Sequence, residues 1–599
     1  MLSGFLETRL LTYSLEDAKK RGYEALSYAW QGEEPSHPIL VDGKRFIVTS
    51  NLHALLLARR RCLKRIDRVV WADAICINQA DTVVEKPAQL LMMKDIYTNS
   101  SRVIGWLGDS WDSGLAADMI TTVDVTHSVF GGIELQDHDR WRFIEATPRW
   151  QALVQTIRNP YFGRAWICQE VVLGHNFQFY IGGYYIPGHK MAEVISHVGS
   201  LAIPSLLQFS FTPTTTAPVS YGNMDNIMSV FALRVFGNSQ EYPLAILLSM
   251  FARLDAGIPR DKIYALLGLS NTRVSQRVIP SYTQHQDVVF RDLAILLLAS
   301  KDDAAAVLPH AGIGYLETAE NLPSWVPDWS IEVRKRSSIL AWHFPKGNLL
   351  ADFSTDGDSS LLPRDLLPKA PIYYASRDSG HCFSTSGDKK FLSLKVLVID
   401  VIADVSAPLL GQFDGSETTA WYRSVAGTFQ AMSVRSPQPQ PTDIDRDAFW
   451  RTLIGDRTRD KFPAPQSWQD YYDIFEESMF SWPLSHERLE YWKQRVDRIC
   501  QPDRNSKDPA FPVLNAALSY YTRLQNTCTG RSFSTTRTSR MGLVPPKTCP
   551  EDLVCIVAGL QTPYILRPHP TDPGVYLLVG ECYMHGVMSG EMMTPDTKL

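Results

Sequence analysis

Five polar side chains lie where apolar, strand-like runs of this chain end, and their chemistry suits a bound ligand. They are Ser27, Tyr28, Asp73, Asn78 and Gln79. The first two lie in the second half of the run 23–30, Asp73 lies within the run 69–76, and Asn78 and Gln79 follow that run. In an open parallel sheet, ligands bind outside the carboxyl ends of the strands. Hydroxyl, carboxylate and amide groups from two strands therefore indicate one shared cleft.

A local role is the alternative for Asp73, Asn78 and Gln79. Side chains of these types accept hydrogen bonds from loop amides, and here they could also cap the helix that begins near Glu85. Either role suits a single polar residue in a loop. The cluster as a whole is therefore stronger evidence for a ligand site than any one of its members.

A sheet flanked by helices would bring these groups together. Between residues 23 and 183, short apolar runs alternate with helix-like runs, which is typical of an α/β fold with a parallel sheet. Strands are expected at 26–30, 69–76, 103–107 and 177–181, and helices at 50–62, 85–99 and 159–170. Residues 39–48 predict a hairpin that turns at Asp42-Gly43.

The rest of the chain predicts a helical middle and a small β-rich end. Apolar stripes at helical spacing occur at 242–254, 261–269 and 287–299, and helices are also expected at 468–500 and 512–522. Strand-like runs follow at 553–558, 564–566 and 575–579. The expected domains are 1–185 (α/β), 220–330 (helical), 331–510 (mixed, with linkers) and 511–599 (β-rich).

Composition excludes several functional classes. The 599 residues carry a net charge of −5, so no overall basic charge favours nucleic acid. No apolar run approaches the roughly 18 residues of a membrane helix, and no secretory signal is recognisable, so we expect a cytoplasmic protein that does not bind membranes. Neither the nine cysteines nor the 14 histidines have metal-ligand spacing. No metal site is therefore expected. The sequence also contains no P-loop, GxGxxG, GxSxG or HExxH motif.

Five ordered motifs resemble the heterokaryon incompatibility (HET) domain of filamentous fungi. They occupy residues 23–30 (YEALSYAW), 71–89 (WADAICINQADTVVEKPAQ), 93–97, 103–108 and 164–170 (RAWICQE). Beyond them, residues 261–268 and 322–329 and the segment 542–586 resemble the middle and tail of long members of this family. Gln31 and Pro87 depart from the family pattern, which puts local geometry at these two positions in question.

The resemblance implies a role in vegetative incompatibility, in which fusion of genetically unlike hyphae triggers growth arrest or cell death. It implies protein partners within that system and self-association of the HET domain on activation. The family's domain is also similar to Toll/interleukin-1 receptor (TIR) domains, so the implied fold of the first domain is flavodoxin-like.

Some TIR domains cleave NAD with a glutamate on a helix, and Glu170 is the residue here in a comparable place. An NAD glycohydrolase needs a carboxylate and an aromatic surface, which Glu170 with Trp30 or Tyr28 would supply. NAD would then be a substrate, and no cofactor would be required. A non-catalytic scaffold and an inactive regulatory paralogue are the alternatives. Cys168 is either an activated thiol or, more simply, a buried inert one.

Overall fold

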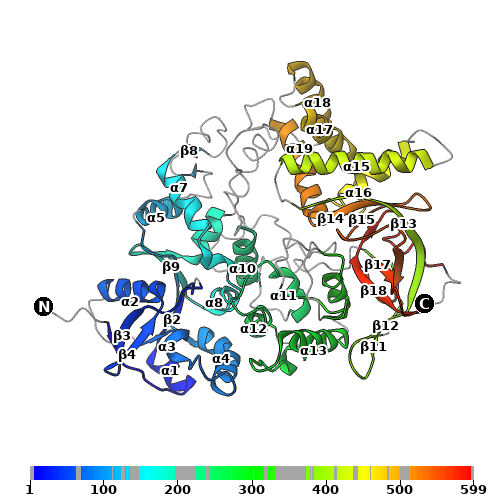
Figure 1. Cartoon of the computed structure of the whole chain (residues 1–599). Helices are drawn as coiled ribbons and strands as arrows, with labels where there is room; N and C mark the ends of the chain where they lie inside the picture. The colour runs from blue at the N-terminus through cyan, green and yellow to red at the C-terminus, as the bar shows by residue number, and fades with distance from the viewer. Residues whose placement is uncertain are drawn as a thin grey trace. The chain divides into compact units, whose positions relative to one another are not determined.

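The structure is a computed structural model of the whole chain (Figure 1). It describes residues 6–30, 32–62, 69–110, 112–122, 129–130, 133–134, 147–195, 224–236, 242–270, 273–300, 303–315, 322–330, 373–377, 379–380, 383–410, 415–435, 443–458, 461–481, 485–499 and 511–594. Gln31 and the region 331–372 lie outside these residues. Two compact units emerge: the described parts of 1–200 and 220–286 form the first, and those of 287–330 and 373–594 form the second.

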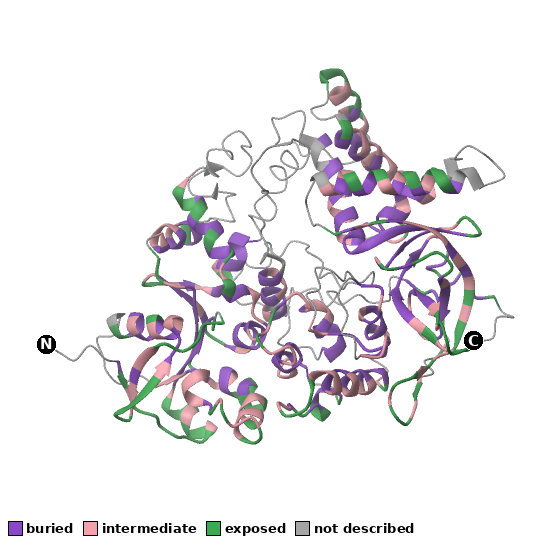
Figure 2. Ribbon diagram, in the orientation of Figure 1, coloured by how far each residue is buried: buried purple, intermediate pink, exposed green. Residues whose placement is uncertain are grey.

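A five-stranded sheet forms the centre of the first unit. Its strands run in the order β10 (Tyr184–Pro187), β9 (Phe177–Ile181), β6 (Arg102–Trp106), β2 (Glu24–Ser27) and β5 (Val70–Trp71). The last four are mutually parallel, and β10 returns antiparallel to β9. Numbered along the chain, the parallel strands lie in the order 2-1-3-4. Every residue of β2 is buried, as in a strand covered on both faces (Figure 2).

Helices connect and cover these strands. They are α1 (Leu15–Arg21), α2 (Ser50–Cys62), α4 (Glu85–Asn99), α5 (Ser113–Thr122), α7 (Pro148–Ile157) and α8 (Ile167–Leu173). Pro87 falls in the first turn of α4, where a missing N–H breaks no helical hydrogen bond. The hairpin at Asp42-Gly43 is confirmed: β3 (His37–Val41) pairs with β4 (Lys44–Val48), and both turn residues have positive φ. This hairpin and β1 (Glu7–Thr8) form a separate sheet.

Three predicted elements of the first unit differ from the structure. The strand expected at 26–30 is β2, which begins at Glu24 and ends at Ser27, so Tyr28 and Trp30 follow the strand. The strand expected at 69–76 ends at Trp71, because the Asp73 carboxylate accepts the Ala74 N–H (2.8 Å) and a short helix, α3 (Asp73–Cys76), begins there. The helix expected at 159–170 is instead a 3₁₀ turn, η1 (Pro160–Gly163), followed by α8. Between them, the Ala165 N–H bonds to the Asp255 carbonyl (2.7 Å), so the helical hydrogen bonding is interrupted.

Helices from the predicted middle region extend the first unit. Helices α10 (Met224–Phe236) and α12 (Asp261–Leu267) pack against α8, and α11 (Leu244–Met250) packs against α12. Arg234 on α10 donates to the Gly174 carbonyl (2.6 Å) and the His175 carbonyl (3.0 Å), just after α8 ends. Arginine there satisfies carbonyls that lack helical partners. The helical prediction holds for this region, whereas the predicted domain boundaries stay predictions.

The second unit contains an antiparallel sheet that closes on itself. Its seven strands run in the order β18 (Tyr576–Glu581), β17 (Pro563–Pro568), β16 (Leu553–Val557), β13 (Val396–Leu409), β14 (Arg531–Thr536), β15 (Met541–Val544) and β19 (Tyr583–Met584). Only Cys582 separates β18 from β19, so one chain segment pairs with β17 at one edge and with β15 at the other. The long strand β13 has several register shifts, which allow it to bend.

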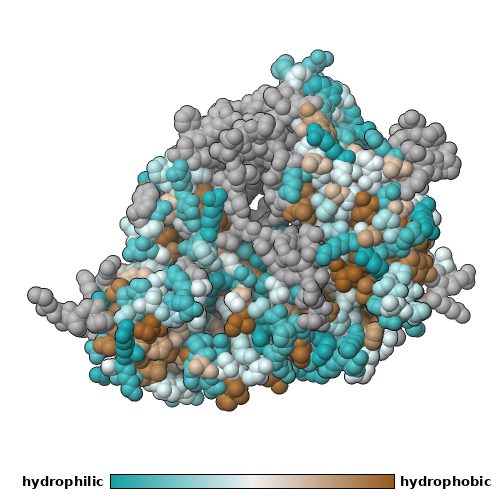
Figure 3. All heavy atoms as spheres, viewed as in Figure 1, coloured by the Kyte–Doolittle hydropathy of each residue, from teal (hydrophilic) through white to brown (hydrophobic). Residues whose placement is uncertain are grey.

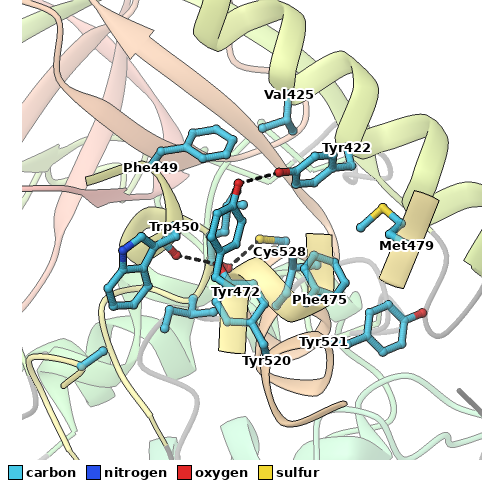
Figure 4. Close-up of a cluster of buried hydrophobic side chains, with 14 of the residues drawn as sticks. Tyr422, Val425, Phe449, Trp450, Tyr472, Phe475, Met479, Tyr520, Tyr521 and Cys528 are labelled. Atoms are coloured by element: carbon cyan, nitrogen blue, oxygen red, sulfur yellow. Dashed lines mark hydrogen bonds between the residues drawn. The ribbon is translucent and has the colours of Figure 1, made fainter. Parts of the chain in front are cut away.

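Five helices form a second core in this unit. They are α15 (Gly415–Arg435), α16 (Asp443–Leu453), α17 (Trp468–Ser481), α18 (His486–Ile499) and α19 (Phe511–Cys528), and α13 (Gln286–Leu298) precedes them in the chain. Aromatic side chains dominate the core (Figure 4). Three of the tyrosine hydroxyls are bonded within it: Tyr422 to Tyr472 (2.7 Å) and Tyr520 to the Trp450 carbonyl (2.7 Å). Burial of these polar tips is therefore compensated.

The described surface is mixed in polarity. Figure 3 shows hydrophobic residues interspersed among hydrophilic ones on the visible face, as is normal for globular proteins. Within the described part of the chain, no helix combines the length and the apolar character needed to cross a membrane. In outline the chain is α/β, with a mixed N-terminal sheet, intervening helices and an antiparallel C-terminal sheet, as the sequence predicts.

Candidate ligand site at the carboxyl end of strand β2

Strand β2 ends at the point where the order of the parallel strands reverses. From β2 the chain passes to β5 on one side and then to β6 on the other. Such a reversal leaves a crevice at the carboxyl ends, because the two connections diverge to opposite sides. Ser27 is the last residue of β2 and Tyr28 follows it; both are buried. The sheet therefore delivers the two residues to the location where open α/β sheets bind ligands.

The buried part of the site is centred on an ion pair. Arg164 Nη1 lies 3.0 Å from Glu170 Oε2, and Arg164 Nη2 lies 2.9 Å from Glu170 Oε1. The Ser27 hydroxyl donates to Glu170 Oε2 and is also hydrogen-bonded to the Tyr161 hydroxyl. Glu170 is 2% exposed, and the side chain of Arg164 is 16% exposed. This bidentate, charge-assisted pair joins α8 to the segment after η1 and to the end of β2.

A second carboxylate, Asp73, forms the part of the site nearer to solvent. Its Oδ1 accepts the Tyr28 hydroxyl (2.7 Å), and its Oδ2 accepts the indole N–H of Trp30 (3.2 Å). Trp30 is 37% exposed, so its ring reaches the surface while its N–H points to the carboxylate. The site thus offers solvent an aromatic surface beside a carboxylate.

The electrostatics couple these two parts. Burial raises the pKa of Asp73, and the charge of Glu170 raises it further, while the Tyr28 hydrogen bond and the Arg164 charge oppose the increase. Burial alone would lower the pKa of Arg164, but the adjacent Glu170 carboxylate outweighs burial and raises it. One guanidinium therefore acts on both carboxylates, and Asp73 is held closer to protonation than a surface aspartate.

Three tyrosines around the site stay protonated. Burial raises the pKa of Tyr28, Tyr97 and Tyr161, and nearby carboxylates raise it further: Asp73 for Tyr28, Glu170 for Tyr161 and both for Tyr97. Their hydroxyls therefore act as neutral hydrogen-bonding groups. Cys168 is fully buried, and burial followed by the Glu170 charge raises the pKa of its thiol. It is therefore an inert thiol at neutral pH.

Five of the seven predicted site residues converge here: Ser27, Tyr28, Trp30, Asp73 and Glu170. Gln79 contributes only support, because its side chain donates to the Asp73 backbone carbonyl (3.1 Å). Asn78 lies in the adjoining loop, where its side chain accepts the Ala80 N–H (3.2 Å) and its own N–H bonds to Glu85 (2.9 Å). Both Asn78 contacts are local, as in the alternative role that the sequence also allowed for this residue.

Arg164 and Tyr161 are site residues that sequence reasoning missed. Both precede Glu170 in one short segment, and Arg164 opens the motif 164–170. A continuous helix would not have placed Arg164 against Glu170, because positions six apart lie on different faces. The break at Ala165 allows the pairing. The sequence feature that could have indicated this pair is an arginine just before the start of a helix and a glutamate in its first turn.

The arrangement suits a ligand with a ring and hydroxyl groups. Trp30 offers a stacking surface, and Asp73 offers hydrogen-bond acceptors beside it. Both carboxylates are bonded through both oxygens, but Glu170 is only 2% exposed whereas Asp73 is partly exposed, so Glu170 orders the site and Asp73 borders solvent. Among the residues that the structure describes, no group of His, Cys, Asp and Glu side chains could hold a metal ion.

Comparison with known proteins gives two family matches. Residues 23–170 match the family "Heterokaryon incompatibility protein (HET)", and residues 441–598 match the "Het-6 beta-barrel domain". The first match ends at Glu170. The second covers α16 to α19 and six strands of the closed sheet, and it agrees with the family-like tail predicted at 542–586.

The chain is also similar to a curated protein over most of its length. It is 25% identical, over 95% of this chain and 90% of the relative, to "Heterokaryon incompatibility protein 6, OR allele" of Neurospora crassa. No solved structure matches the chain. Together, the motifs, the two family matches and this long similarity place the chain among the HET domain proteins, with its HET domain at residues 23–170.

Proposed function

We propose that this protein is an effector or sensor of fungal heterokaryon incompatibility, which triggers growth arrest or cell death after non-self recognition. The HET match and the similarity to a heterokaryon incompatibility protein support this role. In this proposal the protein acts in the cytoplasm with protein partners of the incompatibility system, and its HET domain self-associates on activation.

The proposed mechanism is TIR-like cleavage of NAD. The parallel strand order 2-1-3-4 supports it, because flavodoxin-like sheets begin with this order and bind ligands where it reverses. The observation that carries the proposal is the pairing of an exposed indole with a carboxylate, Trp30 with Asp73, at that point. Trp30 would stack on a ring of NAD, and Asp73 would accept a ribose hydroxyl.

The reaction would be a hydrolysis. Water adds to C1′ of the ribose as the bond to the nicotinamide nitrogen breaks, and the bonding electrons leave with nicotinamide. ADP-ribose and a proton are the other products. A carboxylate beside C1′ stabilises the positive charge that develops there. Asp73 is the carboxylate nearer to solvent, so it takes this role, and Glu170 with Arg164 and Ser27 positions the end of β2.

A scaffold without catalysis is the second candidate. The observation that favours it is the state of Glu170, which is 2% exposed and bonded through both oxygens. In that case the cluster only braces the HET domain, which then signals by assembling with partners.

Nicotinamide release from NAD by the purified full-length protein distinguishes the two candidates. Catalysis predicts release by the wild type and a loss of at least about 100-fold in Asp73→Asn, the usual scale for a catalytic carboxylate. Trp30→Ala should mainly raise KM. Glu16→Gln is the matched control, since Glu16 is exposed on α1 and 77% of its side chain is accessible.

The same variants are then overexpressed in fungal cells. Under the NAD proposal, toxicity and NAD loss disappear together in Asp73→Asn. Toxicity without nicotinamide release, unchanged in Asp73→Asn, would establish the scaffold instead. Toxicity that persists after deletion of residues 1–185 would refute the assignment of the effector role to the HET domain.

A further inference from the structure

Two arginines of the second unit lie side by side, and no acidic partner for them is found among the residues that the structure describes. Arg457 follows α16, and Arg523 lies on α19. Arg523 Nε donates to the Arg457 backbone carbonyl at 3.0 Å, so the two residues are neighbours. Arg457 is only 5% exposed. Within the described parts of the chain, neither guanidinium has an ion pair or hydrogen bond to a carboxylate.

Other buried or partly buried arginines of this unit are paired with carboxylates. Arg451 is paired with Asp447 and Asp456, each at 2.7 Å. Arg531 is paired with Glu581 at 3.1 Å, and Arg567 with Asp552 at 2.7 Å. Proteins pair buried charges because an uncompensated one is strongly destabilising. Arg457 and Arg523 are thus a local excess of two positive charges.

Their surroundings supply little compensation. Burial, and then the charge of Arg457, lowers the pKa of Arg523 to about 9, while only Tyr373 and Cys528 act in the opposite direction. Burial raises the pKa of Tyr373, so its hydroxyl, which donates to the Gly455 carbonyl (2.6 Å), is neutral and offsets no positive charge. The nearby Asp456 is committed to Arg451 and to the Ala464 N–H (3.2 Å). Arg523 is only partly buried, so one member of the pair borders solvent.

We propose that Arg457 and Arg523 form a binding site for a phosphoryl dianion. Two guanidinium groups supply several N–H donors, and a tetrahedral dianion neutralises both charges while accepting from each fork. A carboxylate would neutralise only one charge. Inorganic phosphate and a phosphate ester share this chemistry. The site belongs to the segment that matches the Het-6 beta-barrel domain and is independent of the cluster at β2.

Thermal unfolding of the full-length protein tests the proposal, with inorganic phosphate as the probe and acetate at equal ionic strength as the comparison. A ligand that binds the folded state raises Tm with its concentration. We expect phosphate to raise the Tm of the second unit and acetate to leave it unchanged. Calorimetric titration with phosphate and with glycerol phosphate then identifies the source, since the tighter ligand is closer to the natural one.

Two substitutions remove one charge each, Arg457→Met and Arg523→Met. Both should abolish the phosphate response. In phosphate-free buffer both should be at least as stable as the wild type, because a repulsion is relieved; a merely structural arginine would instead lose stability. The matched control is Arg446→Met on α16, whose arginine is paired with Asp473 (3.1 Å) and Glu476 (3.2 Å). It should lose stability and keep the phosphate response.

Three outcomes would overturn the site. One is a Tm that does not respond to phosphate together with no heat of binding. Another is a phosphate response that survives both substitutions. The third is a loss of stability in phosphate-free buffer on replacing either arginine. Arg523→Lys is a further variant: it keeps the charge without the planar fork, so phosphate binding should weaken while the fold stays intact.

Discussion

At the level of single residues, the ion pair between Arg164 and Glu170 is the centre of the β2 site. Both of its partners are removed from water, and each is bonded through two atoms. Attraction between buried charges offsets the loss of their hydration only while both are present. The contribution of the ion pair to stability is therefore seen when one of its two partners is removed.

Arg164→Met should destabilise the first unit by about 3–5 kcal/mol, because it leaves the buried charge of Glu170 uncompensated. Adding Glu170→Gln to this variant should restore part of the loss. Native-state hydrogen exchange of the amides in α8 measures both effects without assuming that the two units unfold together. Lys20→Ala is the control, since Lys20 pairs with Glu16 at the surface and should change little. Equal losses in the single and double variants would show that Glu170 is not charged.

Asp73 should make the stability of the first unit depend on pH. Its pKa is raised mainly by burial, so its folded pKa exceeds its unfolded value of about 3.9. The stability it contributes is fully present below the unfolded pKa and is lost as pH rises through the folded pKa. At neutral pH the ionised Asp73 is therefore a source of instability.

We accordingly expect Asp73→Asn to gain stability relative to the wild type as pH rises from about 4 to 7, measured by urea unfolding at several pH values. The substitution also removes an acceptor for Tyr28 or Trp30, which changes the free energy of unfolding by the same amount at every pH. The informative quantity is therefore how the difference in unfolding free energy between variant and wild type varies with pH. A difference that does not vary with pH would mean that Asp73 ionises in the fold without a penalty.

At the level of elements, α8 depends on its neighbours. It has seven residues, too few for a helix that is stable alone. Arg234 of α10 bonds to carbonyls at its carboxyl end. In the other direction, Gln169 of α8 donates to the carbonyls of Tyr264 (3.3 Å) and Ala265 (3.0 Å), which lie in the last turn of α12. The middle helices thus position the helix that carries Glu170.

Gln169→Leu should remove both hydrogen bonds and leave two buried carbonyls of α12 without this donor. The expected loss is about 1–3 kcal/mol, seen as faster hydrogen exchange in α12 and α8. Gln151→Leu on α7 is the matched control, because Gln151 is exposed. If exchange in α12 were unchanged, the packing of α12 on α8 would not depend on these bonds.

At the level of the whole molecule, the first unit is larger than the HET match. The match ends at residue 170, whereas the compact unit continues through described residues up to 286. The added helices cover apolar side chains of the sheet; for example, Phe231 packs on Phe177, with ring centroids 6.4 Å apart. A HET domain cut at residue 185 would expose that surface.

We therefore expect a fragment of residues 1–286 to fold. A fragment of residues 1–185 should instead aggregate or be cleaved rapidly by protease. Circular dichroism, size-exclusion chromatography and limited proteolysis of the two fragments test this. Equal folding of both would mean that the middle helices are not needed for the stability of the sheet.

Much of the local structure was predictable from sequence, because its signals are local. The hairpin at Asp42-Gly43 was expected because a turn with two positive φ angles favours these residues. The strands and helices that were correct have apolar residues at period 2 or 3.6. The strand at 69–76 and the helix at 159–170 were wrong where single contacts, at Asp73 and Ala165, overrode the periodicity.

The sequence by itself determined the kinship of this chain with HET domain proteins and the convergence of Ser27, Tyr28 and Asp73 at a strand end. Such features depend on residue types and on short spacings. Only the tertiary structure decided which carboxylate faces solvent, that Arg164 pairs with Glu170, and that β13 joins strands more than 100 residues later in a closed sheet. The same holds for Arg457 beside Arg523. These contacts form between segments that are far apart in the sequence. Such long-range contacts produce no periodic pattern of apolar residues from which they could be predicted.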